Sequence, residues 1–410
     1  MNYLLLLFLV IVVAGFLFEW WLDRLNAASW TPELPVAGRD IYNEDRYRLS
    51  RKYFLENARL DQIASLVSVF LLVLLLTTGA FGWLDQQARQ IAPGPFFSAV
   101  LFFGILGAGA EIIHLPFSAY RTFVIEEKYG FNKTTLRIFV LDRIKAYFLA
   151  IFLGGGILWI VISLYTAYGR SFWILGWGVV CLVTAAMGMF YTTLLLPVFN
   201  KLTRLQEGGL RHAIQAYCDS NGFKLKNIFV MDGSKRSTKS NAFFSGLGPK
   251  KSIVLFDTLV AGYTDEELTA VLAHEVGHYK LRHTYKGILV SVLNAGIVFF
   301  VLSLLLGNPA LAKAMGAGEN SFQLDFLAFG ILYSPLSILT SILVNFLSRK
   351  HEFEADRFAR ETFGAAALAS ALRKLSAENL SNLTPHPAYV FVHYSHPPVL
   401  ERLEALEKKS

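Results

Sequence analysis

The sequence predicts a mainly α-helical protein that crosses a membrane several times and carries a metal-binding region outside the bilayer. Hydrophobic residues make up 54% of the 410 residues and charged residues only 17%, and the mean hydropathy is +0.44. An ordinary soluble chain of this length is less apolar. Long uncharged runs recur along the chain, and each approaches or exceeds the ~20 residues that span a bilayer. A His-Glu-x-x-His motif lies in the second half of the sequence.

Seven apolar runs are candidates for membrane spans, and six of them contain few charges. The remaining run, 96–117, includes Glu111 and His114, so its inner end is expected to face a wet cavity or the bundle interior, or else to lie at headgroup level. The first run has no positively charged start and no small-x-small cleavage site, so we interpret it as a retained span and not as a signal peptide. The predicted spans are 4–21, 64–83, 96–117, 147–168 and 172–196, followed by a hairpin of two spans within 287–348.

Lysine and arginine are confined to alternate loops, with the exceptions of Arg89, Arg170 and Lys313. By the positive-inside rule, the N-terminus is expected to be extracytoplasmic, and the active site and the C-terminus cytoplasmic. The net charge of +7 follows from this topology and from attraction to anionic lipid, so we expect no nucleic acid as a partner. The chain divides into five N-terminal spans (1–199), a cytoplasmic segment (200–286), a transmembrane hairpin (287–348) and a second cytoplasmic segment (349–410).

The motif at 274–278 predicts a zinc metalloendopeptidase. On a helix, His274 and His278 lie on one face and can share a zinc ion, and Glu275 between them lies within reach of a metal-bound water. Zinc lowers the pKa of its water toward ~7 and polarises a peptide carbonyl, while a carboxylate takes the proton. Thr264 and Glu267 read as a capping box that starts the helix. We therefore expect one zinc ion per chain, with Glu275 as the general base.

A catalytic zinc site needs a third protein ligand and one open position. Glu352 and Asp356 are four residues apart, so one can bind the metal while the other holds a ligand histidine. Glu352 is the favoured ligand; His351 could also bind metal, but as the immediate neighbour of Glu352 it faces about 100° away on a helix. Without the histidine motif, the same acids would indicate a charged helix that pairs with nearby arginines. His283 is expected to lie at the level of the lipid headgroups.

Two runs of β-branched and aromatic residues precede the zinc motif, at 227–231 and 252–256. They predict a small β-sheet or hairpin, whose edge could bind an extended peptide as an additional strand. The chain has only two cysteines, Cys181 and Cys218. One lies in an apolar span, so neither a disulfide framework nor a cysteine nucleophile is expected.

Several stretches accompany the zinc motif in a fixed order: Phe123–Asn132, Asp232–Ser237, Ser240–Ala242, Glu352–Asp356, Tyr394–Pro398 and Glu401–Arg402. Together they resemble the type 1 CAAX prenyl endopeptidase family of multi-span zinc metalloproteases, which act on prenylated C-terminal peptides. The resemblance implies a barrel of seven transmembrane helices around a large intramembrane chamber, closed on the cytoplasmic side by a zincin-like metalloprotease domain. It also implies that Glu352 is the third zinc ligand, that His396 and Arg402 hold substrate or the oxyanion, and that Asn241 contacts the peptide.

The resemblance leaves the natural substrate open, beyond a peptide or protein that meets the enzyme at the lipid bilayer. Short extracytoplasmic loops favour a bacterial member in the inner membrane, whereas a eukaryotic member would lie in the endoplasmic reticulum membrane. An alternative function is quality control, in which damaged or misfolded membrane proteins are cleaved. A lower-ranked alternative is a non-catalytic binding or transport protein, with Glu111 and His114 lining a pathway. Nothing in the sequence predicts the oligomeric state.

Overall fold

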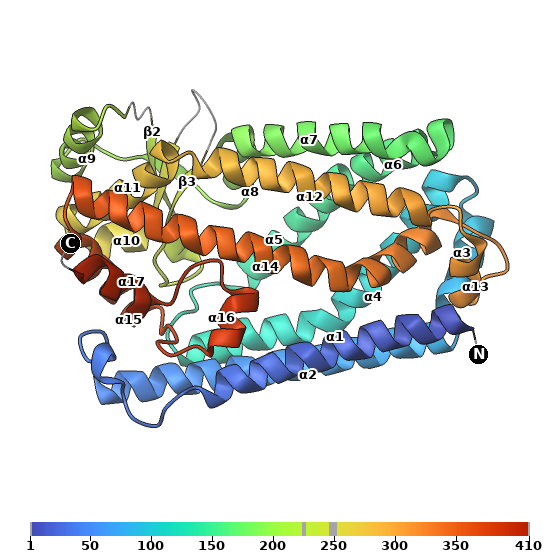
Figure 1. Ribbon diagram of the computed structural model, residues 1–410, viewed down its shortest axis with the longest axis horizontal. Coiled ribbons are helices and arrows are strands. Elements are labelled where there is room, and N and C mark those ends of the chain that lie inside the picture. The colour runs from blue at the N-terminus through green and yellow to red at the C-terminus, as the bar shows by residue number, and fades with distance from the viewer. Residues whose placement is uncertain (1, 224–226, 246–251, 409–410) are drawn as a thin grey trace.

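The long apolar runs form helices that lie side by side along the length of the molecule (Figure 1). The computed structural model describes residues 2–223, 227–245 and 252–408. Helices α1 and α2 pack together along one side, α7 and α12 pack together along the other, and α14 runs between them (Figure 1). The helices of the membrane region are α1 (Tyr3–Ala28), α2 (Glu44–Thr77), α3 (Ala80–Ile91), α4 (Pro95–Tyr120), α5 (Leu136–Leu149), α6 (Gly155–Tyr168), α7 (Phe172–Phe190), α8 (Leu196–Phe199), α12 (His283–Leu305), α13 (Pro309–Ala314) and α14 (Phe322–Thr362).

Among the described residues, six helical runs are long and apolar enough to cross a membrane. The longest, Leu136–Phe199, contains 64 residues and turns back on itself at η4 (Gly169–Ser171), where Gly169 has a φ of +55°. Only glycine adopts such a conformation easily. Helices α6 and α7 on either side of this turn pack against each other, so the run makes two helical passes. The described residues thus contain six long apolar runs, one of which folds back on itself, where the sequence predicts seven separate spans.

The second span ends earlier than predicted. Helix α2 stops at Thr77, and Gly79, with a φ of +71°, separates it from α3. Helix α3 packs against the connection between α12 and α14, where a Cβ on Gly82 would lie 2.3 Å from the carbonyl carbon of Gly316. Phe81 is buried in a cluster of apolar side chains that also contains Ala314 and Met315 of this connection. The apolar residues after Thr77 therefore serve packing between helices and do not extend the span.

The polar end of the third span faces neighbouring helices. Glu111 forms an ion pair with Arg143 of α5, and Arg143 also donates a hydrogen bond to Ser118. The Nε2 atom of His114 lies 3.4 Å from the hydroxyl oxygen of Ser68 in α2. Both side chains thus reach a neighbouring helix, with Glu111 partly buried and His114 exposed.

The described residues contain a four-stranded sheet in the order β1-β2-β4-β3. Strands β2 (Asn227–Met231) and β4 (Ser252–Phe256) coincide with the two predicted strands, but they pair in parallel and so do not form a hairpin with each other. Strand β1 (Leu202–Arg204) pairs with β2, and β3 (Ala242–Ser245) pairs antiparallel with β4 at the other edge. Strand β3 contacts helix α11, which places this edge beside the metal-binding motif.

The predicted capping box starts the helix that carries this motif. The Thr264 hydroxyl accepts a hydrogen bond from the Glu267 N–H at 3.2 Å, and the Glu267 carboxylate accepts one from the Thr264 N–H at 2.9 Å. The helix packs on α9, α14 and α15, and its apolar side chains enter a core that also contains Trp30 and Tyr47 from the first loop and α2. The helices of this region are α9 (Gly209–Ser220), α10 (Asp257–Gly262), α11 (Asp265–Lys280), α15 (Ala365–Glu378), α16 (Pro387–His393) and α17 (Val399–Glu407).

Candidate metal centre

The predicted ligands come together where α11 crosses the C-terminal part of α14. The crossing is close because Gly277 has no side chain: a Cβ at this position would lie 3.2 Å from the Cα and the carbonyl oxygen of Ala355. Ala355 is itself fully buried. Because α14 is 41 residues long, it extends past its apolar half and brings its acidic residues to α11. The crossing therefore places Glu352 opposite the two histidines of the motif.

His274, His278 and Glu352 form a compact set of metal-ligating side chains. The Nε2 atoms of the two histidines lie 3.1 Å apart, and the Glu352 carboxylate oxygens lie 3.5 Å from His274 Nε2 and 3.2 Å from His278 Nε2. Ligands about 2.0–2.1 Å from a tetrahedral zinc ion lie roughly 3.3 Å from one another. His274 is only 7% exposed and Glu352 only 4% exposed. Two imidazole nitrogens and a carboxylate oxygen at this spacing fit a zinc ion.

The environment of His274 favours a positive charge. Its Nδ1 atom lies 2.8 Å from Oδ1 of Asp356. Burial opposes protonation of the imidazole, but the carboxylates of Asp356 and Glu352 outweigh this effect and raise the pKa of His274 to about 9. The same carboxylates favour a metal cation at Nε2 in place of the proton.

Arg402 and His396 approach these carboxylates from the C-terminal segment. The Arg402 guanidinium donates two hydrogen bonds to Asp356, at 2.8 and 2.7 Å, and its Nη1 atom lies 3.3 Å from Glu352 Oε2. The Arg402 side chain is 11% exposed. His396 places Nδ1 2.9 Å from Glu352 Oε2, yet its side chain is 64% exposed. The Arg402 guanidinium is thus already bound by the carboxylates, whereas the His396 side chain is accessible to a substrate.

The ligand set lines a cavity of about 1110 Å³. Glu275, Asn241 and His396 line it as well, so the structure brings together all but two of the predicted site residues at one cavity; Asp356 and Arg402 lie behind the ligands. The rest of the wall comes from strand β3 and from the spanning helices α7, α12 and α14, and it contains both apolar and polar side chains. Its apolar residues include Val183, Met187, Ile288, Val290, Val344 and Leu347.

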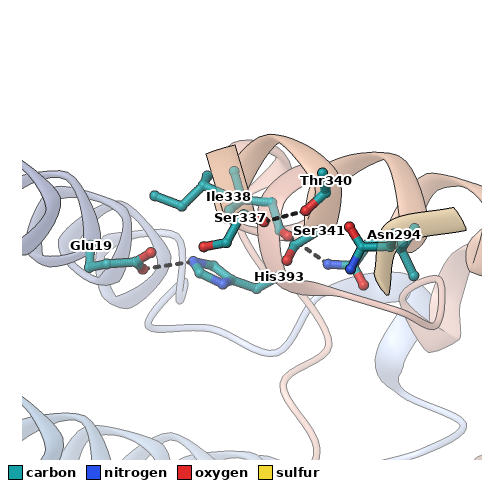
Figure 2. Close-up of a pocket in the computed structure, with 10 residues that line it drawn as sticks. Glu19, Asn294, Ser337, Ile338, Thr340, Ser341 and His393 are labelled. Carbon is teal, nitrogen blue, oxygen red and sulfur yellow. Dashed lines mark hydrogen bonds and ion pairs between the residues drawn. The ribbon is translucent and has the colours of Figure 1, made fainter. Parts of the chain in front are cut away.

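A second cavity, of about 360 Å³, lies between α1, α12, α14 and α16, and Val344 lines both cavities. Its wall is rich in hydroxyl and amide groups, and Figure 2 shows the ion pair between Glu19 and His393, which are 3.0 Å apart. The hydrogen bond to Glu19 raises the pKa of His393. The sequence reasoning missed this polar cluster, although Ser337 and Ser341 lie on one face of α14 at helical spacing.

The structure contradicts the expectation that His283 lies at headgroup level. Its side chain is 4% exposed, its Nδ1 atom lies 3.1 Å from Nδ1 of His278, and its Nε2 atom lies 2.9 Å from Glu354 Oε2. Its ring also stacks on His351, with centroids 4.1 Å apart. The cause is the turn at Arg282, with a φ of +59°, which directs the first turn of α12 back against α14.

Comparisons with known proteins agree with this architecture. Residues 24–201 match the family model for the CAAX prenyl protease N-terminal region with five membrane helices, and residues 204–410 match that for peptidase family M48. The chain is 35% identical to a CAAX prenyl protease 1 homolog of Oryza sativa subsp. japonica, over 97% of this chain and 96% of that protein. It is 32% identical to CAAX prenyl protease 1 of Saccharomyces cerevisiae, over 96% and 93% of the two chains.

The solved structures include one of the same fold. The crystal structure of S. mikatae Ste24p superposes with a TM-score of 0.92 at 31% identity and covers 99% of both chains. These relatives come from a plant and from yeasts, so they give no support to a bacterial origin; short loops limit the size of a protein and do not identify its organism. The match over both halves shows that this chain belongs to peptidase family M48 and, within it, to the CAAX prenyl proteases.

Proposed function

We propose that this protein is a zinc endopeptidase that cleaves peptide bonds near the C-terminus of prenylated CAAX-type substrates. The observation that carries the proposal is the 1110 Å³ cavity, whose wall combines a metal-ligand set with apolar side chains of spanning helices. A prenylated peptide has the same two parts, a polar chain to be cut and an apolar lipid. The relatives named CAAX prenyl protease 1 support this assignment of substrate.

In the proposed reaction, His274, His278 and Glu352 would hold the zinc ion. When bound, zinc supplies a Lewis acid and makes its water acidic enough to deprotonate near pH 7. Glu275 lines the cavity beside both histidines, so it can take a proton from the attacking water and later pass it to the leaving amine. His396 Nδ1 faces Glu352, so the exposed ring can donate a hydrogen bond from Nε2 to the carbonyl oxygen, as negative charge develops there, when both of its nitrogens carry a proton.

Arg402 was expected to act with His396 on the substrate, but its contacts favour a positioning role. Its guanidinium is bound in a fork to Asp356, which in turn lies against His274 Nδ1. A carboxylate at this place orients a ligand histidine and makes its other nitrogen more basic. We therefore propose that Arg402 and Asp356 position the side chains of His274 and Glu352 and do not contact the substrate.

We propose that the peptide binds as an added strand along β3. This strand lies at the edge of the sheet and contacts α11, and Asn241 immediately precedes it in the cavity wall. The Asn241 side-chain oxygen accepts a hydrogen bond from the Ala242 N–H at 2.8 Å, which holds the side chain at the start of the edge. Backbone hydrogen bonds of this kind accept many sequences, so specificity would come from the side-chain and lipid pockets.

We also propose that the metal centre and the C-terminus are cytoplasmic and the N-terminus extracytoplasmic. The connection between α1 and α2 packs on the C-terminal segment. The Ser29 hydroxyl donates a hydrogen bond to the Thr384 carbonyl at 2.8 Å, and the Tyr42 hydroxyl donates one to the Ser376 carbonyl at 2.8 Å. The helices near Arg89 and Lys313 lie at the other end of the molecule (Figure 1). The lysine and arginine bias therefore separates the two ends as the positive-inside rule requires.

The test is cleavage of a fluorescent farnesylated CAAX peptide by the purified protein and by Glu275→Gln. The wild type should cleave the peptide, and the variant should be slower by about 10²–10⁴-fold with unchanged zinc content, because only the general base is lost. An unprenylated peptide of the same sequence is the control for lipid recognition. If both proteins bind zinc but neither cleaves the farnesylated peptide, while unfolded membrane proteins are cut by the wild type alone, quality control replaces this substrate assignment.

A further inference from the structure

A chain of two contacts extends from the predicted zinc ligand His278 through His283 to Glu354 of α14. His278 Nδ1 lies 3.1 Å from His283 Nδ1, and His283 Nε2 lies 2.9 Å from Glu354 Oε2. The His283 side chain is 4% exposed, and that of Glu354 is 29% exposed. A buried imidazole held on both ring nitrogens has a fixed orientation, and none of the roles assigned above uses it.

The proton positions along this chain follow from the ligand chemistry. If His278 binds the metal through Nε2, which faces Glu352 and His274, its neutral ring carries its proton on Nδ1. That N–H points to His283 Nδ1, which must then be the acceptor. A neutral His283 with a bare Nδ1 carries its proton on Nε2, and this N–H donates to the Glu354 carboxylate. Every nitrogen in the chain thus has one role and one partner.

We propose that His283 and Glu354 are positioning residues that fix the tautomer and the ring orientation of the zinc ligand His278. The proposal rests on the function proposed above only in that His278 binds zinc through Nε2. Each ligand histidine would then be held at Nδ1 by a carboxylate. For His274 the carboxylate is Asp356, in direct contact. For His278 it is Glu354, reached through the imidazole of His283. Partners of this type typically change metal affinity by about 10–100-fold.

Together with His351, the side chains of His283 and Glu354 could also form a second metal site, because one potential ligand atom from each of the three lies within 4.8 Å of the others. The tautomers argue against it. A metal on His283 Nε2 would leave the His283 proton on Nδ1, where it would face the N–H of His278 across 3.1 Å with no acceptor between them. The rings of His283 and His351 are also stacked at an interplanar angle of 12°, so their nitrogens lie side by side and do not converge on one point. His351 therefore serves as a stacking partner.

The experiment compares zinc affinity in His283→Leu, His283→Gln and Glu354→Gln, measured by competition with a chelating dye on the full-length protein. His283→Leu should bind zinc about 10–100-fold more weakly. His283→Gln should recover most of this loss, because a carboxamide can accept from His278 and donate to Glu354. Glu354→Gln should fall between the two. The electronic spectrum of the Co²⁺-substituted protein should change in His283→Leu and return toward the wild-type spectrum in His283→Gln.

His351→Phe is the matched control, because it keeps a stacked ring and removes the nitrogens; it should bind one zinc ion with wild-type affinity. Thermal unfolding of the zinc-free proteins identifies a variant that fails to fold, in which case Glu354→Gln decides the matter. Wild-type zinc affinity in His283→Leu would overturn the proposal. Two zinc ions in the wild type, with one lost in His351→Phe, would overturn it in favour of a second site. A wild type that binds no zinc would instead overturn the proposed function.

Discussion

Replacing Gly277 by alanine tests whether the close crossing of α11 and α14 sets the metal geometry. The new Cβ would lie 3.2 Å from three atoms, namely Cα and the carbonyl oxygen of Ala355 and Cβ of Phe358. Optimal contacts between carbon atoms are about 3.5–4.0 Å, so the helices must separate by roughly 0.3–0.8 Å. Alanine gains about 1 kcal/mol of helix propensity over glycine, and overpacking costs about 1–3 kcal/mol. The zinc-free protein should therefore lose only about 0–2 kcal/mol.

The effect on the metal should be larger than the effect on stability, because zinc–ligand distances tolerate changes of only about 0.2 Å. We expect Gly277→Ala to bind zinc at least about tenfold more weakly, or ~1.4 kcal/mol. Chelator competition gives the affinity, and thermal unfolding gives the stability. Gly15→Ala in α1 is the control, since a Cβ there meets nothing within 4 Å. Wild-type zinc affinity in Gly277→Ala, together with increased stability, would refute this account of the crossing.

Three further predictions concern charge, loop position and metal. Burial alone would raise the pKa of Glu267, but hydrogen bonds with Lys374 and Ser370 outweigh it, so the pKa is lowered. The Glu267 carboxylate therefore stabilises the fold at pH values above its ordinary pKa of about 4.5. This contribution is lost as the pH falls through the lowered pKa. Glu267→Gln should therefore lower the unfolding temperature at pH 7 and have less effect below about pH 4; equal effects at both would contradict this. Arg236 lies in the loop that leads to β3, and its guanidinium donates to both carboxylate oxygens of Asp142, at 2.7 and 3.0 Å. A lysine cannot make this paired contact and would hold the loop less firmly. Arg236→Lys should therefore raise KM for the peptide more than it lowers kcat. Chelation should abolish cleavage until zinc is restored, and a chelated protein that still cleaves would show that the metal is not needed.

Features that depend on neighbouring residues in the chain were predictable. The strands at 227–231 and 252–256 match β2 and β4, and the capping box places the start of α11 correctly, because β-branching and capping act over a few residues. The pairing of Glu352 and Asp356 was also visible, since residues four apart share a helix face. Hydropathy located the spans for the same reason.

Features that depend on tertiary packing were not predictable in this way. The second span was placed too long because the close approach of Gly82 to Gly316 involves segments far apart in the sequence. The environment of His283 depends on the left-handed turn at Arg282 and on contact with Glu354 of α14, neither of which has a local pattern. The parallel pairing of β2 with β4 likewise requires β3 to lie at the edge, although it falls between them in the chain.

We propose that His274, His278 and Glu352 hold one zinc ion and leave one position open. Zinc K-edge X-ray absorption of the purified protein, with the metal content measured on the same sample, can identify these ligands. We expect about one zinc per chain, with two imidazoles and oxygen ligands at roughly 2.0–2.2 Å, and loss of an oxygen ligand or of the metal in Glu352→Ala. A sulfur ligand at about 2.3 Å, or an unchanged spectrum and zinc content in Glu352→Ala, would contradict it.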